Sequence, residues 1–565
     1  MSLLGLNQAA NCMLNSRKSL EITGLNITNS QVEGYTRQEA VQTPVITGYS
    51  VEAPGSNVVS VGAKISEITR FRSGFIDTNY RNESINAGEL SAESTYLGEM
   101  SQIFTDDSEL GLSNILNEFW QGWNDASRNP DDTIVRNMVI EEGNNLARAI
   151  RLKSQKMTET TARLDGEIES VVEEINTIAE KLASINDRII QSAPTTTQIN
   201  AMMDQRDLML DQLSELVGVQ ILGSVKESLT IYLDGMPLIA NKKVYKLDVQ
   251  KDAFHNFHIY SSSGKELNIT GGKLSGLLDI KTDYIPEYKN ELDEMTVAII
   301  EQVNIAHKFG YGLDGSTGLD FFNGTSASNI GMNITAAEQV ALSVPKLVST
   351  SNINVDGEQV MSSETLAAAS AKFLTAPEAA GTINVNGVDI DWLDTDTIQD
   401  ILAKIEEDTG IRSTFNIDSQ EFLFSTPPDS STITINDTAG NFTVFTNILG
   451  AVTTGGEPGD GENGIRIFEI SAKPIFGAPD PNQTINDKYR NLVSKVGFET
   501  NTVKSKNEIQ SDHVKSIYEM RQSESGVSID EETINLMKYQ RTFQAGARLA
   551  SVIDEMLVSL ISIGK

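Results

Sequence analysis

The strongest constraint in this sequence is a pair of seven-residue repeats within its last forty residues. Apolar or small residues recur in two series offset by three positions: Leu536, Phe543, Ala550 and Leu557, and Tyr539, Gly546, Ile553 and Leu560. Such series form one narrow apolar row along a helix on the order of 50 Å long, as in a coiled coil. We call this row the C-terminal seam and predict that it packs against another helix. The alternative is a surface helix packed on its own domain, which would need a wider apolar face.

The first residues of the chain carry a similar but weaker repeat. Its four apolar members, which we call the N-terminal seam, are Leu6, Met13, Leu20 and Ile27. The remaining positions are rich in Asn and Ser, which are poor helix formers. Because such a helix is ordered mainly by packing, the two chain ends are candidate partners for each other.

Charge and composition exclude several classes of partner. The chain has 565 residues, 44 of them basic and 78 acidic, and its net charge is −34. Nucleic acid and anionic membrane surfaces would repel this charge, so neither is an expected partner. The excess of acidic residues lies in the middle of the chain, because residues 1–45 and 526–565 are nearly neutral. No apolar run reaches the length of a membrane span, so we expect no membrane insertion. No cleavable secretory signal is visible.

The middle of the chain has the patterns of helices, then strands, then an inserted module. Seven-residue series over residues 150–189 and an apolar pattern over 199–217 predict an antiparallel pair of helices. Residues 228–239 are strand-like, and a helix is predicted over 292–306. Residues 345–464 hold nineteen acidic and four basic residues and predict a small α+β module.

Together these patterns predict a multidomain α+β fold, since the chain is too long for a single hydrophobic core. The predicted parts are terminal coiled-coil helices (1–45 and 515–565), a middle domain of helical bundle and β structure (46–344 and 465–514), and an inserted β-rich outer module (345–464).

No catalytic, cofactor-binding or metal site is predicted. Residues 310–315 match GxGxxG, but a helix precedes them where a dinucleotide fold needs a strand, so a turn is favoured. The aspartates of residues 389–396 suggest calcium, but Asp394 stands where a helix–loop–helix calcium site needs Gly. Four histidines and one cysteine, Cys12, supply few nucleophiles or metal ligands. A single cysteine also excludes an intrachain disulfide and leaves the redox compartment open.

Motifs at both ends and in the centre resemble those of one protein family. Asn26-Ile27-Thr28-Asn29 and Gly34-Tyr35-Thr36-Arg37-Gln38 resemble the N-terminal signature of bacterial flagellar rod, hook and hook-associated proteins. The signature positions carried over to this chain are Asn26, Asn29, Gly34, Tyr35, Arg37 and Gln38. Residues 525–532 resemble the C-terminal signature of the family, and residues 271–322 resemble the central region of its hook–filament junction members.

The resemblance implies a structural axial protein of the bacterial flagellum and not an enzyme. It implies secretion, unfolded and with an uncleaved N-terminal signal, through the flagellar type III pathway to the hook–filament junction. The implied partners are further copies of the chain in a ring, hook protein, the second junction protein and the filament. An export chaperone that binds the C-terminal helix is also implied. The two seams would then be the assembly surface.

Two alternatives stay open. The first is hook protein or a flagellin-like protein, against which residues 271–322 argue. The second is an axial protein with an enzyme in its inserted module, such as a cell-wall hydrolase. A hydrolase of this kind would require paired carboxylates in a cleft.

Overall fold

The computed structural model of the chain has two compact units. It describes residues 2–47, 59–105, 111–191, 196–223, 229–252, 256–344, 346–348, 353–355, 358–417, 419–425, 433–448, 452–454, 460–477 and 482–563. Unit 1 comprises Met1–Gly98, Thr161–Tyr284 and Glu499–Lys565, and unit 2 comprises Glu99–Thr160 and Ile285–Phe498. Three long helices contribute residues to both units: α2 (Gly74–Phe104), α4 (Thr133–Gln191) and α12 (Ile485–Ser525). The three-part division drawn from the sequence stays a prediction.

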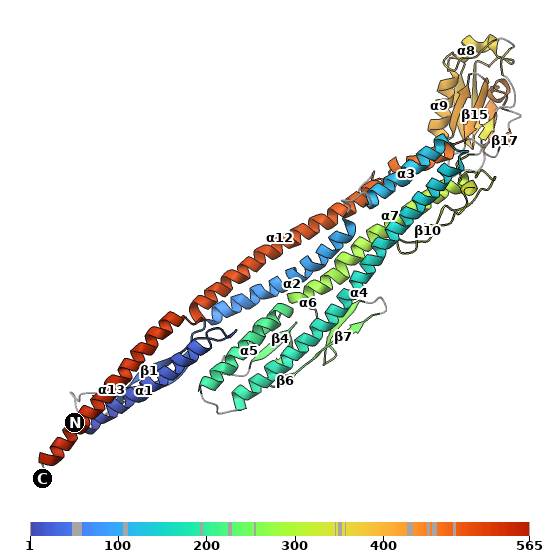
Figure 1. Ribbon diagram of the computed structural model, residues 1–565. Coiled ribbons are helices and arrows are strands. Elements are labelled where there is room, and N and C mark those ends of the chain that lie inside the picture. Colours follow the sequence, from blue (N-terminus) through green and yellow to red (C-terminus); the bar gives the residue numbers. More distant parts are fainter. Residues whose placement is uncertain are drawn as a thin grey trace. The chain divides into compact units, whose positions relative to one another are not determined.

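Unit 1 contains an antiparallel pair made by the two ends of the chain. Helix α1 (Ser2–Thr28) ends beside Asn29, and α13 (Ile529–Ile563) carries the C-terminal seam. The two helices lie side by side (Figure 1). A hairpin of β1 (Gln38–Thr47) and β2 (Val59–Arg70) also packs on α1. Helix α1 is therefore covered both by α13 and by the hairpin.

The rest of unit 1 combines helices with small antiparallel sheets. The end of α4 and helix α5 (Thr196–Leu216) share an apolar cluster of Ile185, Ile189 and Met203, which confirms the predicted helix pair. One sheet contains β3 (Gln220–Leu222), β4 (Thr230–Leu233), β5 (Met236–Ala240) and β6 (Lys243–Val244), in that order. A second contains β7 (Leu247–Lys251) and β8 (Phe257–Ser261). Helix α6 (Gly272–Asp279) follows and continues into a π-helical turn, Ile280–Tyr284.

Unit 2 is built around an aromatic core. Its helices α3 (Leu112–Arg128), α7 (Ile285–Phe309) and α11 (Glu462–Glu469) pack together, and β9 (Phe322–Asn323) pairs with β10 (Gly331–Met332). Rings of Phe119 and Trp123 from α3 meet Phe321, with centroids 6.0 and 5.0 Å away. Among the described helices of the whole chain, none is both long and apolar enough to span a membrane.

The inserted module has a hydrophobic core of its own, which confirms the predicted α+β character. Every member of this cluster lies between Ile353 and Ile448. Its elements include β11 (Lys346–Val348), α8 (Leu366–Ala369), β12 (Ala380–Val385), β13 (Val388–Leu393), α9 (Ile398–Thr409), β14 (Arg412–Asn416), β15 (Glu421–Ser425), β16 (Ile435–Ala439), α10 (Phe442–Phe445) and β17 (Val452–Thr454). They form two antiparallel sheets, ordered β14-β15-β11-β17 and β13-β12-β16.

We expect residues 345–464 to fold cooperatively as an isolated fragment, because their core is self-contained. Trp392 is the only tryptophan of this fragment and is fully buried, so its fluorescence reports unfolding. Phe445→Ala removes a ring that packs 5.5 Å from that of Trp392, and should lower the free energy of unfolding by about 3–5 kcal/mol. The half-exposed control Val388→Ala should change it by about 0.5 kcal/mol or less. A fragment without a cooperative transition in urea would contradict the expectation.

Candidate assembly site

Helix α13 packs closely on α1 at Gly546. A Cβ atom at this position would lie 3.1 Å from Met13 Cγ and 3.3 Å from Cys12 Sγ, so a side chain there would push the helices apart. Further along the pair, Ile553 Cδ1 lies 3.0 Å from the position of a Cβ on Gly5. The C-terminal seam therefore faces α1 of the same chain, as its spacing predicted for a partner helix.

The seam residues differ in how far this packing covers them. The half-buried members of the C-terminal seam are Leu536, Tyr539, Ala550, Ile553 and Leu557. Phe543 is more exposed, at 37%, and the side chain of Leu560 lies outside what the structure describes. In the N-terminal seam, Met13, Leu20 and Ile27 are half-buried and Leu6 is exposed.

The most deeply buried face of α1 is not the N-terminal seam. It is formed by Ala9, Ser16, Ser19, Ile22, Thr23 and Asn26, which are at most 3% exposed. Four of these six side chains are polar, so a search for apolar periodicity passes over them. They are buried because α13 and the β1–β2 hairpin cover α1 from two directions.

The Asn26 site joins α1, the start of β1 and the start of α13. The Asn26 amide is 1% exposed and uses both donors and both lone pairs. It donates to the Gln38 carbonyl (2.9 Å) and to Glu532 Oε2 (3.1 Å). It accepts from the Tyr35 hydroxyl (2.8 Å) and from the Gln38 backbone N–H (3.1 Å). A buried amide with four good hydrogen bonds is fully satisfied.

The other signature residues complete this site. Arg37 Nε donates to Glu532 Oε1 at 2.9 Å, which neutralises a carboxylate that is 2% exposed. Gly34 has φ +76°, and a Cβ there would also lie 3.3 Å from Leu208 Cβ, so glycine suits the turn. Asn29 Nδ2 donates to the Leu25 carbonyl and closes the end of α1. Burial, together with the charges of Asp204 and Glu532, raises the pKa of Tyr35, which therefore stays a neutral donor. The predicted signature residues are thus brought together.

An arginine–aspartate network lies beside this site, and the sequence analysis missed it. Arg70 Nη1 pairs with Asp204 (2.7 Å) and with Asp207 (2.9 Å). Arg521 of α12 pairs with Asp211 (2.7 Å), so α5 is tied to the end of β2 and to α12. Burial opposes ionisation of Asp207, but Arg72, Arg70 and Arg81 outweigh it and hold the pKa of this carboxyl below its usual value. The sequence feature that could have indicated this network is the spacing of Asp204, Asp207 and Asp211, which places them on one face of a predicted helix.

A cavity of about 340 Å³ in unit 2 bears on the hydrolase alternative. It is bordered by α7, α11 and the start of β14, and the carboxylate among its lining residues is Glu469. That carboxylate is paired with Arg412 Nη2 at 2.6 Å. A hydrolase of the kind considered needs two carboxylates with distinct roles, so this cavity gives the alternative no support.

We expect Asn26→Ala to loosen the pairing of α1 with α13. The substitution leaves the Tyr35 hydroxyl, the Gln38 backbone and Glu532 short of buried partners, at a cost of about 3 kcal/mol. Amide hydrogen exchange in residues 15–28 should then speed up by roughly a hundredfold. Asn7→Ala, at an exposed position of the same helix, is the matched control. Equal exchange in the two variants would show that the Asn26 site does not hold the pair.

Comparison with known proteins connects these features to a family. A family model for the flagellar hook-associated protein FlgK helical domain matches residues 97–322. A second model, for the flagellar basal body rod FlgEFG protein C-terminal region, matches residues 521–563. The second match covers all of α13.

Comparisons with whole proteins agree with the family-model matches. The chain is 24% identical to flagellar hook-associated protein 1 of Salmonella typhimurium, over 99% of both chains. It is 23% identical to the protein of that name from Bacillus subtilis, over 99% of this chain and 98% of the relative. The fold is similar to that of the flagellar hook junction protein FlgK from Burkholderia pseudomallei, with a TM-score of 0.60 and 16% identity over 80% of this chain and all of that one. These matches make the chain a relative of the flagellar hook-associated protein 1 proteins over 99% of its residues.

Proposed function

We propose that this chain is a structural subunit of the bacterial flagellum that joins the hook to the filament. Similarity to hook-associated protein 1 over nearly the whole chain supports this function, as does the similarity to a solved hook junction protein. The family model over residues 97–322 favours a junction protein over hook protein or a flagellin. The task is mechanical, and the terminal helices are the parts that we assign to assembly.

The observation that carries the proposal is a second set of apolar side chains on α13, which lies off the C-terminal seam and is exposed. We call it the outer row; its members are Ile534 (61% exposed), Leu549 (45%), Val552 (46%) and Met556 (59%). The seven-residue seam already packs on α1 in the same chain. An exposed apolar row that lies beside the seam on the same long helix fits a neighbouring helix.

The two rows have separate roles in this proposal. The C-terminal and N-terminal seams hold the helix pair within one subunit. The outer row contacts further copies in a ring, and the neighbouring hook and filament-side proteins. The nearly neutral ends suit such close contacts, because the excess negative charge of the chain lies in its middle.

Export is the second part of the proposal and follows from the family resemblance. The chain would pass unfolded through the flagellar type III pathway with its N-terminal signal uncleaved. A chaperone would cover α13 before assembly, since the outer row otherwise exposes large apolar side chains to water.

We expect Val552→Asp to block incorporation at the hook tip. Burying this side chain against a neighbour would contribute about 1.5 kcal/mol per subunit, and an unpaired charge in that contact adds a larger penalty. Because Val552 lies off the C-terminal seam and is exposed, the subunit should be secreted and folded as usual. Labelling of hook tips, at matched secreted levels, should fall at least about tenfold.

Two further variants separate the roles of the rows. Ser551→Asp adds the same charge at an exposed neighbouring position and should be tolerated. Leu557→Asp, in the C-terminal seam, should instead loosen α1 from α13 within the isolated subunit, visible as faster hydrogen exchange in α1. If Val552→Asp and Ser551→Asp label hook tips equally, the outer row is not the assembly surface.

A further inference from the structure

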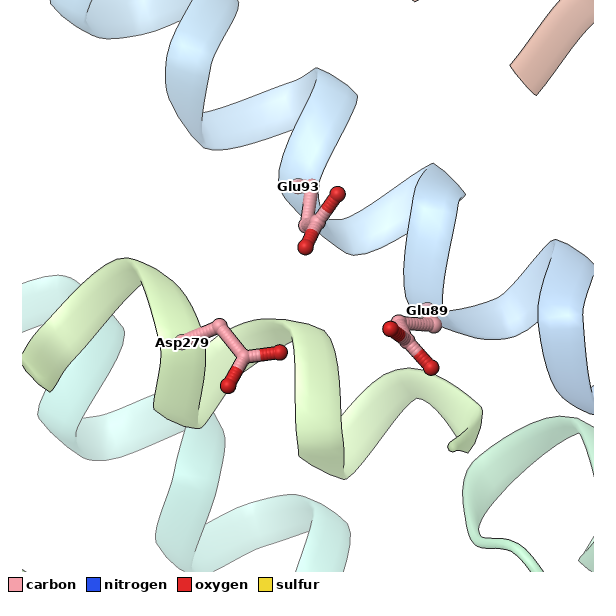
Figure 2. A group of neighbouring side chains, drawn as sticks. All are labelled: Glu89, Glu93 and Asp279. Atoms are coloured by element: carbon pink, nitrogen blue, oxygen red, sulfur yellow. The ribbon is translucent and has the colours of Figure 1, made fainter. Parts of the chain in front are cut away.

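Three carboxylates from two helices meet inside unit 1. Glu89 and Glu93 lie one turn apart on α2, and Asp279 is the last residue of α6. An oxygen atom from each of the three lies within 4.8 Å of the others. Figure 2 shows all three side chains pointing toward the space between the helices. We call these residues the carboxylate cluster.

Close packing of the two helices forces the carboxylates together. A Cβ atom at Gly276 would lie 2.4 Å from the Glu89 carbonyl oxygen, so the backbones of α2 and α6 approach as closely as glycine allows. Asp279 follows one turn later and leads directly into the π-helical turn Ile280–Tyr284. Turns of this kind are frequent at functional sites.

The cluster differs from the other buried carboxylates of unit 1 in having no counter-charge bound to it. Among the described residues, none donates a hydrogen bond or forms an ion pair to any of the three side chains. Glu93 is nonetheless a buried residue, with 9% of its surface exposed. Asp207, by contrast, is paired with three arginines. A buried carboxylate without a partner is costly.

The pKa shifts of the three carboxyl groups agree with this lack of a counter-charge. Burial, with the nearby charges of Glu89 and Asp279, raises the pKa of Glu93 to about 7, against a smaller opposing effect of Lys506 on α12. Burial also raises the pKa of Glu89 and of Asp279, the latter with help from Asp283. All three groups would gain from a bound positive charge.

We propose that Glu89, Glu93 and Asp279 bind a hard divalent cation, Ca²⁺ in preference to Mg²⁺, which links α2 to α6. All three ligands are carboxylate oxygens, the donors that Ca²⁺ and Mg²⁺ take. Glu89 and Asp279 are only half-buried, so water can complete the coordination shell. Ca²⁺ tolerates an irregular shell, whereas Mg²⁺ demands a near-ideal octahedron, and ligands from two separate helices suit the former.

The test compares the full chain with Glu93→Gln and Asp279→Asn, after removal of metal with EDTA. CaCl₂ is titrated by calorimetry at pH 7.5 in 100 mM KCl, and thermal unfolding is recorded with and without it. Wild type should bind one Ca²⁺ per chain, and its Tm should rise by about 5 °C at saturation. Both variants should bind at least about tenfold more weakly. Glu174→Gln, at an exposed position of α4, is the control and should bind as wild type does.

The metal-free proteins provide an independent readout. Because the folded-state pKa of Glu93 is raised, its ionisation destabilises the folded unit as the pH rises from about 4.5 through 7. In EDTA, Glu93→Gln should therefore melt above wild type at pH 8 but not at pH 5, and CaCl₂ should remove the difference at pH 8. If the pH-dependent difference is present but CaCl₂ does not bind, the cluster holds a proton and the cation site is wrong. If Glu93→Gln binds Ca²⁺ as well as wild type, the cation lies elsewhere.

Discussion

The hydrogen bonds of Asn26 are the constraint on which the terminal helix pair depends. A seven-residue apolar repeat permits two helices to slide by seven residues while keeping the same kinds of contact. The Asn26 amide removes that freedom, because its bond to Glu532 is available in one register only. Gly546 then fixes how closely the helices approach, near the other end of the pair. Polar contacts thus set the register, and the seams supply the apolar burial that stabilises it.

Unit 1 contains two groups of buried carboxylates, one with arginine partners and one without. In the arginine–aspartate network, every carboxylate has guanidinium partners, so the cost of removing water is offset by direct ion pairs. The network ties α5, α12 and the end of β2 to one another next to the Asn26 site. In the carboxylate cluster, the close approach of α2 and α6 leaves negative charges facing each other without such partners. The carboxylates of the first arrangement have counter-charges within the chain, whereas those of the second have no ion-pair partner among the described residues.

Local periodicity explains which parts of the fold could be predicted from the sequence. The α4–α5 pair and the helix over residues 292–306 follow from regular apolar spacing, and both are present. Of the continuous helical stretch made by α6, the π-helical turn and α7, the sequence predicted only the part over residues 292–306.

The same distinction between local and long-range features applies to the site residues. The C-terminal seam could be predicted because one short segment contains it, and the signature residues because they resemble a family. The buried polar face of α1 could not, since the side chains of Ser16 and Ser19 carry no apolar signal and are covered by elements distant in sequence. The carboxylate cluster could not be predicted either, because only the folded chain brings Asp279 to Glu89 and Glu93.

The bond between Asn26 and Glu532 spans 506 positions of the chain. Closing so long a loop is entropically costly and slow compared with forming local structure. The two units can therefore gain most of their internal contacts while the chain ends are still apart. In the export that we propose, with one end of the chain leading, the first helix would have no partner until the last forty residues have followed. The helix pair is then a check on completeness, because a chain that stops short leaves the Asn26 amide without its acidic partner and α1 without its cover.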